Sequence, residues 1–259
     1  MVRGLKKFKE YFKDFDGHYV IIGGTACDII IEKVGFKPRA TKDIDIVLIV
    51  ESLSVDFSKR LWQFINDGEY QQRQKSEGSK EFYRFINPEK SEFPQQIELF
   101  ARKPDLIILE SDAHLTPIPL NDDLSSLSAI LIDEDYYQYV IGNSFIEDGV
   151  RVAKIETLIC LKALAFLEII DRKEKGFQID EKQIRKHKTD VFRLTAMLTP
   201  GSIFELPKTI QSHVNQFAAL VSGDLPDKSI FKEMKLNNID PIDLFEQFKK
   251  SFKVGENEV

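Results

Sequence analysis

The sequence predicts an α/β (α+β) protein, in which a small mixed sheet with flanking helices is followed by a helical C-terminal bundle. Strand-like runs, with alternating apolar residues or short apolar blocks, occur only before about residue 153. From Ala153 to about Val254, apolar residues recur at helical spacing instead. We therefore expect two domains, residues 1–149 and residues 150–259.

Bulk composition is that of an ordinary globular protein. The 259 residues are 42% hydrophobic and 30% charged, and no apolar run is long enough to cross a membrane. The net charge of −6 excludes a broadly basic protein, so any nucleic acid would be met by a local patch. Cys27 and Cys160 lie in apolar helical segments, which argues against a disulfide framework. We expect a cytoplasmic protein without a membrane anchor.

The first elements alternate between helix and strand. Leu5, Phe8, Phe12 and Phe15 recur at helical spacing and predict a docking helix. Residues 19–22 form a short apolar run that reads as a buried strand. A helix is predicted over residues 26–34, because Gly35 is a typical residue to end it.

Gly23 and Gly24 follow the strand directly, and Thr25 is the expected N-cap of the helix. Glycines lack Cβ, so their backbone can lie close to a ligand and turn N–H groups toward it. The N-terminus of a helix is in addition an anion site. Gly23, Gly24 and Thr25 are therefore candidate phosphate-binding residues.

Asp43 and Asp45 open the next predicted strand. Side chains alternate along a strand, so both carboxylates face the same side, roughly 6–7 Å apart. Two like charges on a strand this apolar are costly unless a cation offsets them. A divalent metal is the simplest such cation, because hard ions prefer carboxylate oxygens. Asp43 and Asp45 are the primary candidate metal ligands.

The remaining elements follow from periodicity. A helix is predicted over residues 56–66, and the polar stretch 68–80 reads as a loop or a short exposed strand. Further strands are expected at residues 81–86, 95–101, 126–132 and 149–152. The later helices are expected at residues 153–170, 181–198, 207–221, 229–236 and 241–252.

The stretch GGTA, followed by RATKDIDIVL, resembles the first motif of the polymerase-beta-like nucleotidyltransferase superfamily. The spacing of Arg39, Thr41, Asp43 and Asp45 resembles the AbiEii/AbiGii toxin branch, known from abortive-infection and type IV toxin–antitoxin systems. The motif covers about thirty residues, and weaker matches extend to about residue 195. The resemblance implies a nucleotidyltransferase-type sheet and adds Arg39 and Thr41 to the nucleotide-binding candidates.

Glu98 is the candidate third carboxylate. Two-metal phosphoryl chemistry uses converging carboxylates, one of which activates the attacking hydroxyl. The resemblance implies that the third acid comes from a later strand, and the segment QIELF around Glu98 has that form. An exposed strand glutamate is the alternative. Four acids in loop-like sequence are weaker competitors: Glu110, Asp112, Asp122 and Asp123.

Lys162 falls inside the apolar stripe of the helix predicted over residues 153–170. A lysine in such a stripe is rarely left without a partner. Its ammonium either meets an anion such as a nucleotide phosphate, or forms a structural ion pair or reaches the surface. The resemblance implies contact with the triphosphate.

Lys188 and Asp190 lie in the charged segment RKHKTDVFRL. AbiEii-like sequences carry a Lys-Asp pair here, followed by an acid three residues on. In this chain Thr189 interrupts the pair and Arg193 stands where the second acid is expected. A phosphate- or acceptor-binding edge and a solvated charged helix both remain open.

These residues predict a nucleotidyltransferase that moves a nucleoside monophosphate from a nucleoside triphosphate to an acceptor hydroxyl. Asp43, Asp45 and Glu98 would bind two Mg²⁺ ions, with Mn²⁺ as an alternative, and the site would lie in a cleft between the domains. The resemblance implies an RNA acceptor, including tRNA 3′ ends, and a regulating antitoxin protein. Two alternatives stay open: a small-molecule nucleotidyltransferase of aminoglycoside-modifying type, and a nucleotide-binding regulatory module without catalysis.

Overall fold

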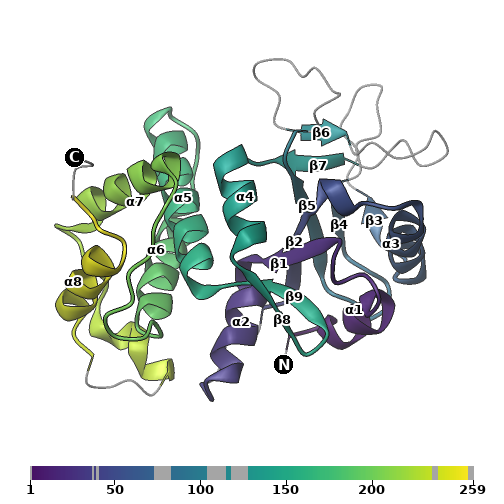
Figure 1. The fold of residues 1–259 in the computed structure, drawn as a ribbon, viewed down its shortest axis with the longest axis horizontal. Coiled ribbons are helices and arrows are strands. Elements are labelled where there is room, and N and C mark those ends of the chain that lie inside the picture. Colours follow the sequence, from purple (N-terminus) through teal and green to yellow (C-terminus); the bar gives the residue numbers. More distant parts are fainter. Residues whose placement is uncertain are drawn as a thin grey trace. The chain divides into compact units, whose positions relative to one another are not determined.

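The computed structural model describes residues 2–36, 38, 41–72, 83–103, 115–117, 128–234 and 239–255. They form two compact units (Figure 1). The first unit is Met1–Glu32 with Pro38–Lys154, and the second is Ile155–Val259 with the short segment Lys33–Lys37. The predicted boundary after residue 149 falls too early, because the strand Val150–Ala153 pairs within the sheet of the first unit.

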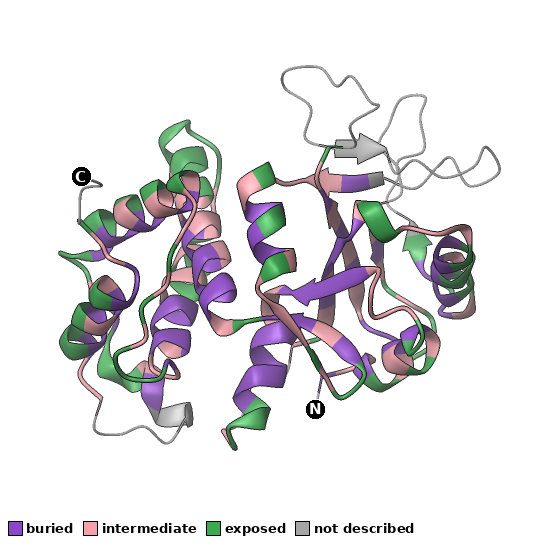
Figure 2. Ribbon diagram, in the orientation of Figure 1, coloured by how far each residue is buried: buried purple, intermediate pink, exposed green. Residues whose placement is uncertain are grey.

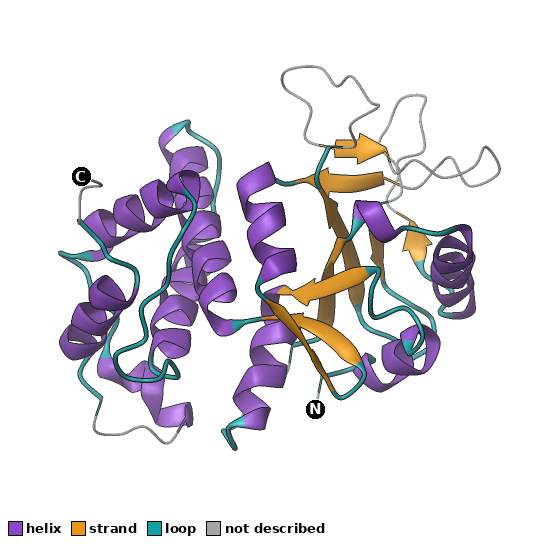
Figure 3. Ribbon diagram, viewed as in Figure 1, coloured by secondary structure: helices purple, strands orange, loops and turns teal. Residues whose placement is uncertain are grey.

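The first unit is a mixed α/β structure, as the sequence predicts (Figure 3). Its sheet has the strand order β3-β4-β5-β2-β1-β9-β8, and β7 pairs with both β5 and β6. The strands are β1 (Tyr19–Ile22), β2 (Asp43–Leu48), β3 (Gln71–Gln72), β4 (Arg84–Ile86), β5 (Gln96–Ala101), β6 (Leu115–Pro117), β7 (Ser128–Leu131), β8 (Ser144–Glu147) and β9 (Val150–Ala153). Its helices are α1 (Leu5–Phe12), α2 (Gly23–Lys33), α3 (Val55–Asp67) and α4 (Glu134–Gly142), with a 3₁₀ turn at Val50–Ser52.

One face of this sheet packs on α1 and α3. The ring of Tyr19 on β1 lies 5.3 Å from that of Phe8 and 6.5 Å from that of Phe57. Because paired residues on neighbouring strands share a face, this apolar face also carries Ile44 and Ile46 of β2. All of these residues are buried, and the ribbon of β1 has the colour of buried residues in Figure 2. The opposite face of β2 therefore carries Asp43 and Asp45.

α4 was not predicted from the sequence, and a polar cluster holds it against the end of β2. The Tyr137 hydroxyl donates to Glu51 Oε2 at 2.5 Å and accepts from the Val50 backbone N–H at 2.8 Å. Arg102, just after β5, forms an ion pair with the same glutamate at 2.8 Å. Although burial favours the neutral acid, the hydrogen bonds from Tyr137 and Arg102 hold the pKa of Glu51 below its usual value.

The second unit is helical over all the residues described for it. Its helices are α5 (Ile155–Glu174), α6 (Glu181–Thr195), α7 (Lys208–Val221) and α8 (Pro241–Ser251), with a 3₁₀ segment at Lys228–Met234. Rings of Phe166, Phe217 and Phe248 meet in its core, with centroids 5.2 and 5.7 Å apart in sequence order. In the described part of the chain, no helix is both long and apolar enough to cross a membrane.

Candidate functional site

The two candidate metal ligands open a central strand of the first unit. Asp43 and Asp45 are half-buried, whereas Ile44 and Ile46 between and beyond them are buried, so the side chains alternate between faces. β2 pairs antiparallel with β1 and parallel with β5. The two carboxylates therefore sit on one face of a strand whose backbone is held on both sides.

Gly23 fits the Asp45 carboxylate closely. A Cβ built on Gly23 would lie 2.0 Å from Asp45 Oδ2, and the residue has φ +65°, which disfavours other side chains. The carboxylate thus occupies the space that any side chain at this position would fill. The backbone turn into α2 and the Asp45 carboxylate of β2 are therefore packed tightly against each other.

The next two residues hold the segment before β2. A Cβ on Gly24 would lie 2.8 Å from Thr41 Oγ1, so Gly24 gives Thr41 the room it needs. The Thr25 hydroxyl donates to the backbone oxygen of Asp43 at 2.6 Å. Thr25 is fully buried and lies inside α2, which begins at Gly23, so the predicted N-cap role of Thr25 is wrong. Its only hydroxyl hydrogen serves the protein backbone.

Glu98 lies directly across from Asp45 in the parallel register of β2 and β5. It therefore faces the same side, at the roughly 4.8 Å spacing of neighbouring strands. Arg84 is the register partner of Glu98 on β4, and the two side chains form a close ion pair. Arg84 was not among the predicted site residues, although its alternation with Tyr83 and Phe85 puts it on the same face as Ile86.

The acids on this face differ in their fit to a metal ion. Among the residues that the structure describes, no group of three or more His, Cys, Asp or Glu side chains is arranged to hold one. Two carboxylates nevertheless suit Mg²⁺, which commonly takes one or two protein carboxylates and completes its shell with water and substrate phosphates. Asp43 and Asp45 fit that ligand set, whereas Glu98 is held by Arg84.

Several candidates lie outside the described residues. They are Arg39 of the predicted nucleotide-binding set and the weaker acids Glu110, Asp112, Asp122 and Asp123.

Lys162 forms an ion pair within the second unit. Its Nζ lies 3.4 Å from Asp190 Oδ2, and the exposed fractions of the two side chains are 9% and 8%. The pair joins α5 to α6. The structure thus brings together two predicted phosphate-binding residues, in the structural ion pair that the sequence left open as an alternative.

Lys188 is engaged elsewhere on the second unit. Its ammonium donates to the backbone oxygen of Asp224 at 2.8 Å and to its carboxylate at 2.6 Å. Lys188 and Asp190 therefore have different partners, and the structure does not bring them together as a Lys-Asp motif.

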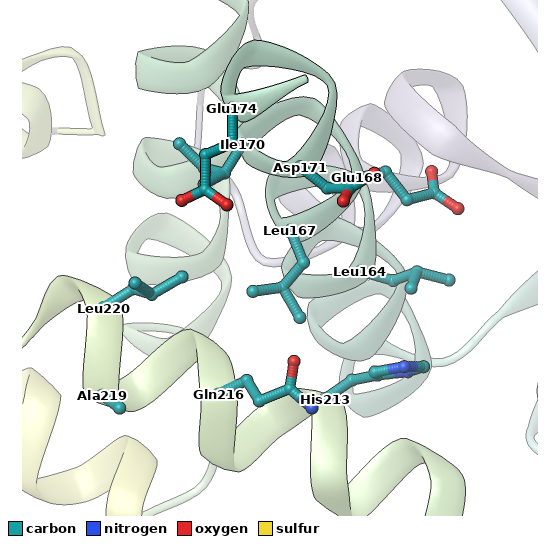
Figure 4. Close-up of a pocket in the computed structure, with 10 residues that line it drawn as sticks. All are labelled: Leu164, Leu167, Glu168, Ile170, Asp171, Glu174, His213, Gln216, Ala219 and Leu220. Atoms are coloured by element: carbon teal, nitrogen blue, oxygen red, sulfur yellow. The ribbon is translucent and has the colours of Figure 1, made fainter.

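A surface groove of about 580 Å³ also lies in the second unit, between α5 and α7 (Figure 4). Leu164, Leu167 and Ile170 of α5 and Leu220 of α7 line it, with Glu168, Asp171 and Glu174 among the polar residues. None of the candidate site residues lines this groove.

The chain matches no protein-family model and no curated protein. Solved structures with a distant likeness include the following two. The polyadenylate synthase of Megavirus is 12% identical, with a TM-score of 0.37 over 85% of this chain and 36% of that chain. JHP933 from Helicobacter pylori is 11% identical, with a TM-score of 0.36 over 96% of this chain and 88% of that one. This chain spans about a third of the length of the Megavirus protein, and any functional conclusion rests on the site geometry.

Proposed function

We propose that this chain is a metal-dependent nucleotidyltransferase. It would transfer a nucleoside monophosphate from a nucleoside triphosphate to an acceptor hydroxyl and release pyrophosphate. The observation that carries this proposal is the Asp43–Asp45 pair on one face of β2, with the Asp45 carboxylate packed against Gly23 at the N-terminus of α2. A carboxylate pair beside a helix N-terminus combines a cation site with an anion site, which is what a metal-bound triphosphate requires.

The residues have distinct roles in this proposal. Asp43 and Asp45 would hold Mg²⁺, or Mn²⁺ in its place, and a second ion would need Glu98 as a further ligand. When bound, the metal would neutralise triphosphate charge and polarise the phosphoryl group under attack. The backbone N–H groups of Gly23, Gly24 and Thr25 would donate hydrogen bonds to phosphate oxygens, with the Thr41 hydroxyl beside them.

The chemistry is a displacement at the α-phosphorus. The acceptor oxygen forms a bond to that phosphorus, the bond to the β-phosphate oxygen breaks, and pyrophosphate leaves with the electron pair. The acceptor proton must pass to a base. Glu98 is the candidate base, and either of its roles, base or metal ligand, requires Arg84 to release it.

The acceptor that we propose is RNA, including tRNA 3′ ends. Lys182, Arg185 and Lys186 are exposed on α6 at spacings of three and four residues, so they share one helix face. On a chain with net charge −6, such a face is a local basic patch of the kind that binds phosphate backbones. A toxin-like role controlled by a protein antitoxin belongs to the same proposal and rests on the motif resemblance alone.

One observation favours a second candidate, a nucleotide-binding module without catalysis. Glu98 is held by Arg84, and among the described residues no group of three acids is arranged to hold a metal ion. Such a module would bind nucleotide and metal without turnover.

One experiment separates these functions. The protein is incubated with α-labelled nucleoside triphosphates and Mg²⁺, in one arm with total RNA and in another with aminoglycosides. We expect label in RNA for the wild type and none for Asp43→Asn or Asp45→Asn, whereas Asp14→Asn, an exposed acid of the same unit, should behave as wild type. Label in the aminoglycoside would assign a small-molecule enzyme, and nucleotide binding without any label transfer would assign the inactive module.

A further inference from the structure

The segment that leads into the carboxylate strand is anchored on α2. Thr41 lies in the segment before β2, and its backbone N–H donates to Oδ2 of Asp28 on α2 at 2.7 Å. Two further contacts act on the same segment: the Thr25 hydroxyl reaches the Asp43 backbone oxygen, and Gly24 abuts the Thr41 side chain. Three residues within two turns of α2 thus fix the path of the chain from Thr41 to Asp43.

Asp28 is an unexpected residue for this position. It is only 3% exposed, and its helix neighbours Cys27, Ile29 and Ile30 are buried apolar residues. A carboxylate in such surroundings is costly unless it is hydrogen-bonded. An apolar residue would fill the same space without that cost, so the sequence retains an acid where packing alone does not call for one.

We infer that Asp28 is a positioning residue for the metal-binding carboxylates. A hydrogen bond from a backbone N–H to a carboxylate is shorter and stronger than one between neutral groups. By holding the Thr41 N–H, Asp28 fixes the backbone two residues before Asp43, and Thr25 fixes the carbonyl of Asp43 itself. The Asp43 side chain then projects from a backbone that is already in place before a ligand arrives. This inference rests on the proposed function, because its ligand is the divalent ion.

The test compares three variants of the whole chain. Asp28→Asn keeps an oxygen that accepts the Thr41 N–H, whereas Asp28→Ala removes the acceptor. Ile31→Ala is the matched control, because Ile31 is buried on the same helix and its apolar side chain makes no hydrogen bond, so its truncation leaves a cavity but keeps the Asp28–Thr41 hydrogen bond. Mn²⁺ binding is measured by calorimetry and by electron paramagnetic resonance, with a non-hydrolysable nucleoside triphosphate present. Exchange of the Thr41 amide proton is measured without ligand.

We expect Asp28→Ala to weaken Mn²⁺ binding by about tenfold or more, the usual effect of losing a group that orients a metal ligand. The exchange of the Thr41 amide should become faster in the same variant. Asp28→Asn should restore both properties toward wild type. Ile31→Ala should lower the melting temperature while leaving the Mn²⁺ affinity of the folded protein unchanged.

The outcomes distinguish this inference from the proposed function. If the wild type binds Mn²⁺ and Asp28→Ala binds it equally well, the positioning role is overturned and the metal site stands. If Asp28→Ala and Ile31→Ala weaken Mn²⁺ binding alike, Asp28 serves only to stabilise the helix, which also overturns the inference. If the wild type binds no Mn²⁺ with nucleotide present, the metal site of the proposed function fails and the inference fails with it.

Discussion

The Asp43–Asp45 pair of the first unit and the Lys162–Asp190 pair of the second unit both place charges on apolar elements. In the second unit the charges are opposite, lie 3.4 Å apart and are almost fully buried. In the first unit two like charges share one face of β2 and remain half-buried. That face of the sheet also carries Glu98 and its ion-pair partner Arg84.

The difference separates a structural pair from a candidate site. Opposite charges in contact offset each other's desolvation within the chain, and removing one of them leaves the other stranded. Like charges on one face repel each other, so a bound cation stabilises the pair and removing one of the charges relieves repulsion. The sign of the stability change on mutation therefore reports which kind of pair is present.

The largest expected effect is on turnover. Asp43→Asn or Asp45→Asn should lower nucleotide transfer by at least about 10²–10³-fold, the scale of losing one group that stabilises transition-state charge. The free energy of unfolding should stay the same or rise, because one of two like charges is removed. Transfer assays and thermal melts of the apo protein measure the two effects. Full activity with Mg²⁺ in either variant would remove that residue from the metal site.

Breaking the opposite pair should act in the reverse sense. Lys162→Met leaves a buried carboxylate without its lysine, so we expect the free energy of unfolding to fall by about 3–5 kcal/mol. Replacing both partners, as in Lys162→Met with Asp190→Leu, should recover most of that loss. Denaturant titrations of the two variants and the wild type measure this.

The Lys162→Met variant also tests the alternative that the Lys162 ammonium contacts a nucleotide phosphate. If the apo protein keeps its stability and nucleoside triphosphate binding weakens by about 1.5–3 kcal/mol, the ammonium contacts a phosphate. Trp62 is the only tryptophan of the chain and lies in the first unit, so its fluorescence shows whether that unit stays folded in the variant.

A smaller effect is expected at the glycine turn. In Gly23→Ala the new Cβ would meet Asp45 Oδ2 at 2.0 Å, in addition to the strain of a positive φ. Gly35→Ala is the matched control, because Gly35 has φ +82° and nothing within 4 Å of a built Cβ. Backbone strain alone costs about 1–3 kcal/mol. Gly23→Ala should therefore lose more stability than Gly35→Ala, and only Gly23→Ala should weaken Mn²⁺ binding. Equal losses without an effect on metal would show that the carboxylate moves aside at little cost.

The smallest effect concerns alkaline pH and separates the two units. All seven tyrosines lie between residues 11 and 139, within the first unit. Burial and the hydrogen bond to Asp67 raise the pKa of Tyr11 to about 12, and burial raises those of Tyr19, Tyr70 and Tyr137 further. An unfolded tyrosine loses its proton near pH 10. Stability from these residues is therefore complete below pH 10 and falls as the pH rises toward and beyond 12.

Hydrogen exchange resolved by segment measures this difference between the units. Protection in β1 and α3 should fall above pH 10 before protection in α5 and α7 does, after correction for the intrinsic exchange rate. Tyr11→Phe should reduce the loss. Equal loss in both units would mean that they unfold together.

Periodicity and turn chemistry were sufficient to predict much of the fold. The Gly-Gly turn, the strand that begins at Asp43 and the four long C-terminal helices were all predictable, because each depends on local patterns. The strand carrying Glu98 was expected as a later strand of the sheet only from the resemblance. α4 was missed because Tyr136, Tyr137 and Tyr139 favour strands. Its helical signal lay at the N-terminus, where Asp133 caps the helix and Glu134 follows.

The candidate site was predictable in its residue types and less so in its partners. Alternation alone puts Asp43, Asp45 and Glu98 on one face once the strands are paired. The partners of Glu98 and Lys162 depend on register and on helix packing between distant segments, so Arg84 and Asp190 could not be chosen from the sequence. The hydrogen bond from the Thr25 hydroxyl to the Asp43 carbonyl is likewise not visible in a local pattern.

The order of strands in the sheet has a consequence for synthesis on the ribosome. β2 has both of its neighbours, β1 and β5, once residue 101 has been made, but the other edge of β1 pairs with β9, which ends at Ala153. At typical translation rates the intervening residues take roughly 3–10 s. During that interval the nascent sheet would present β1 as an open edge, to which another strand can add. Chaperone capture or misassembly of the nascent chain should therefore concentrate on β1 and end when β9 emerges.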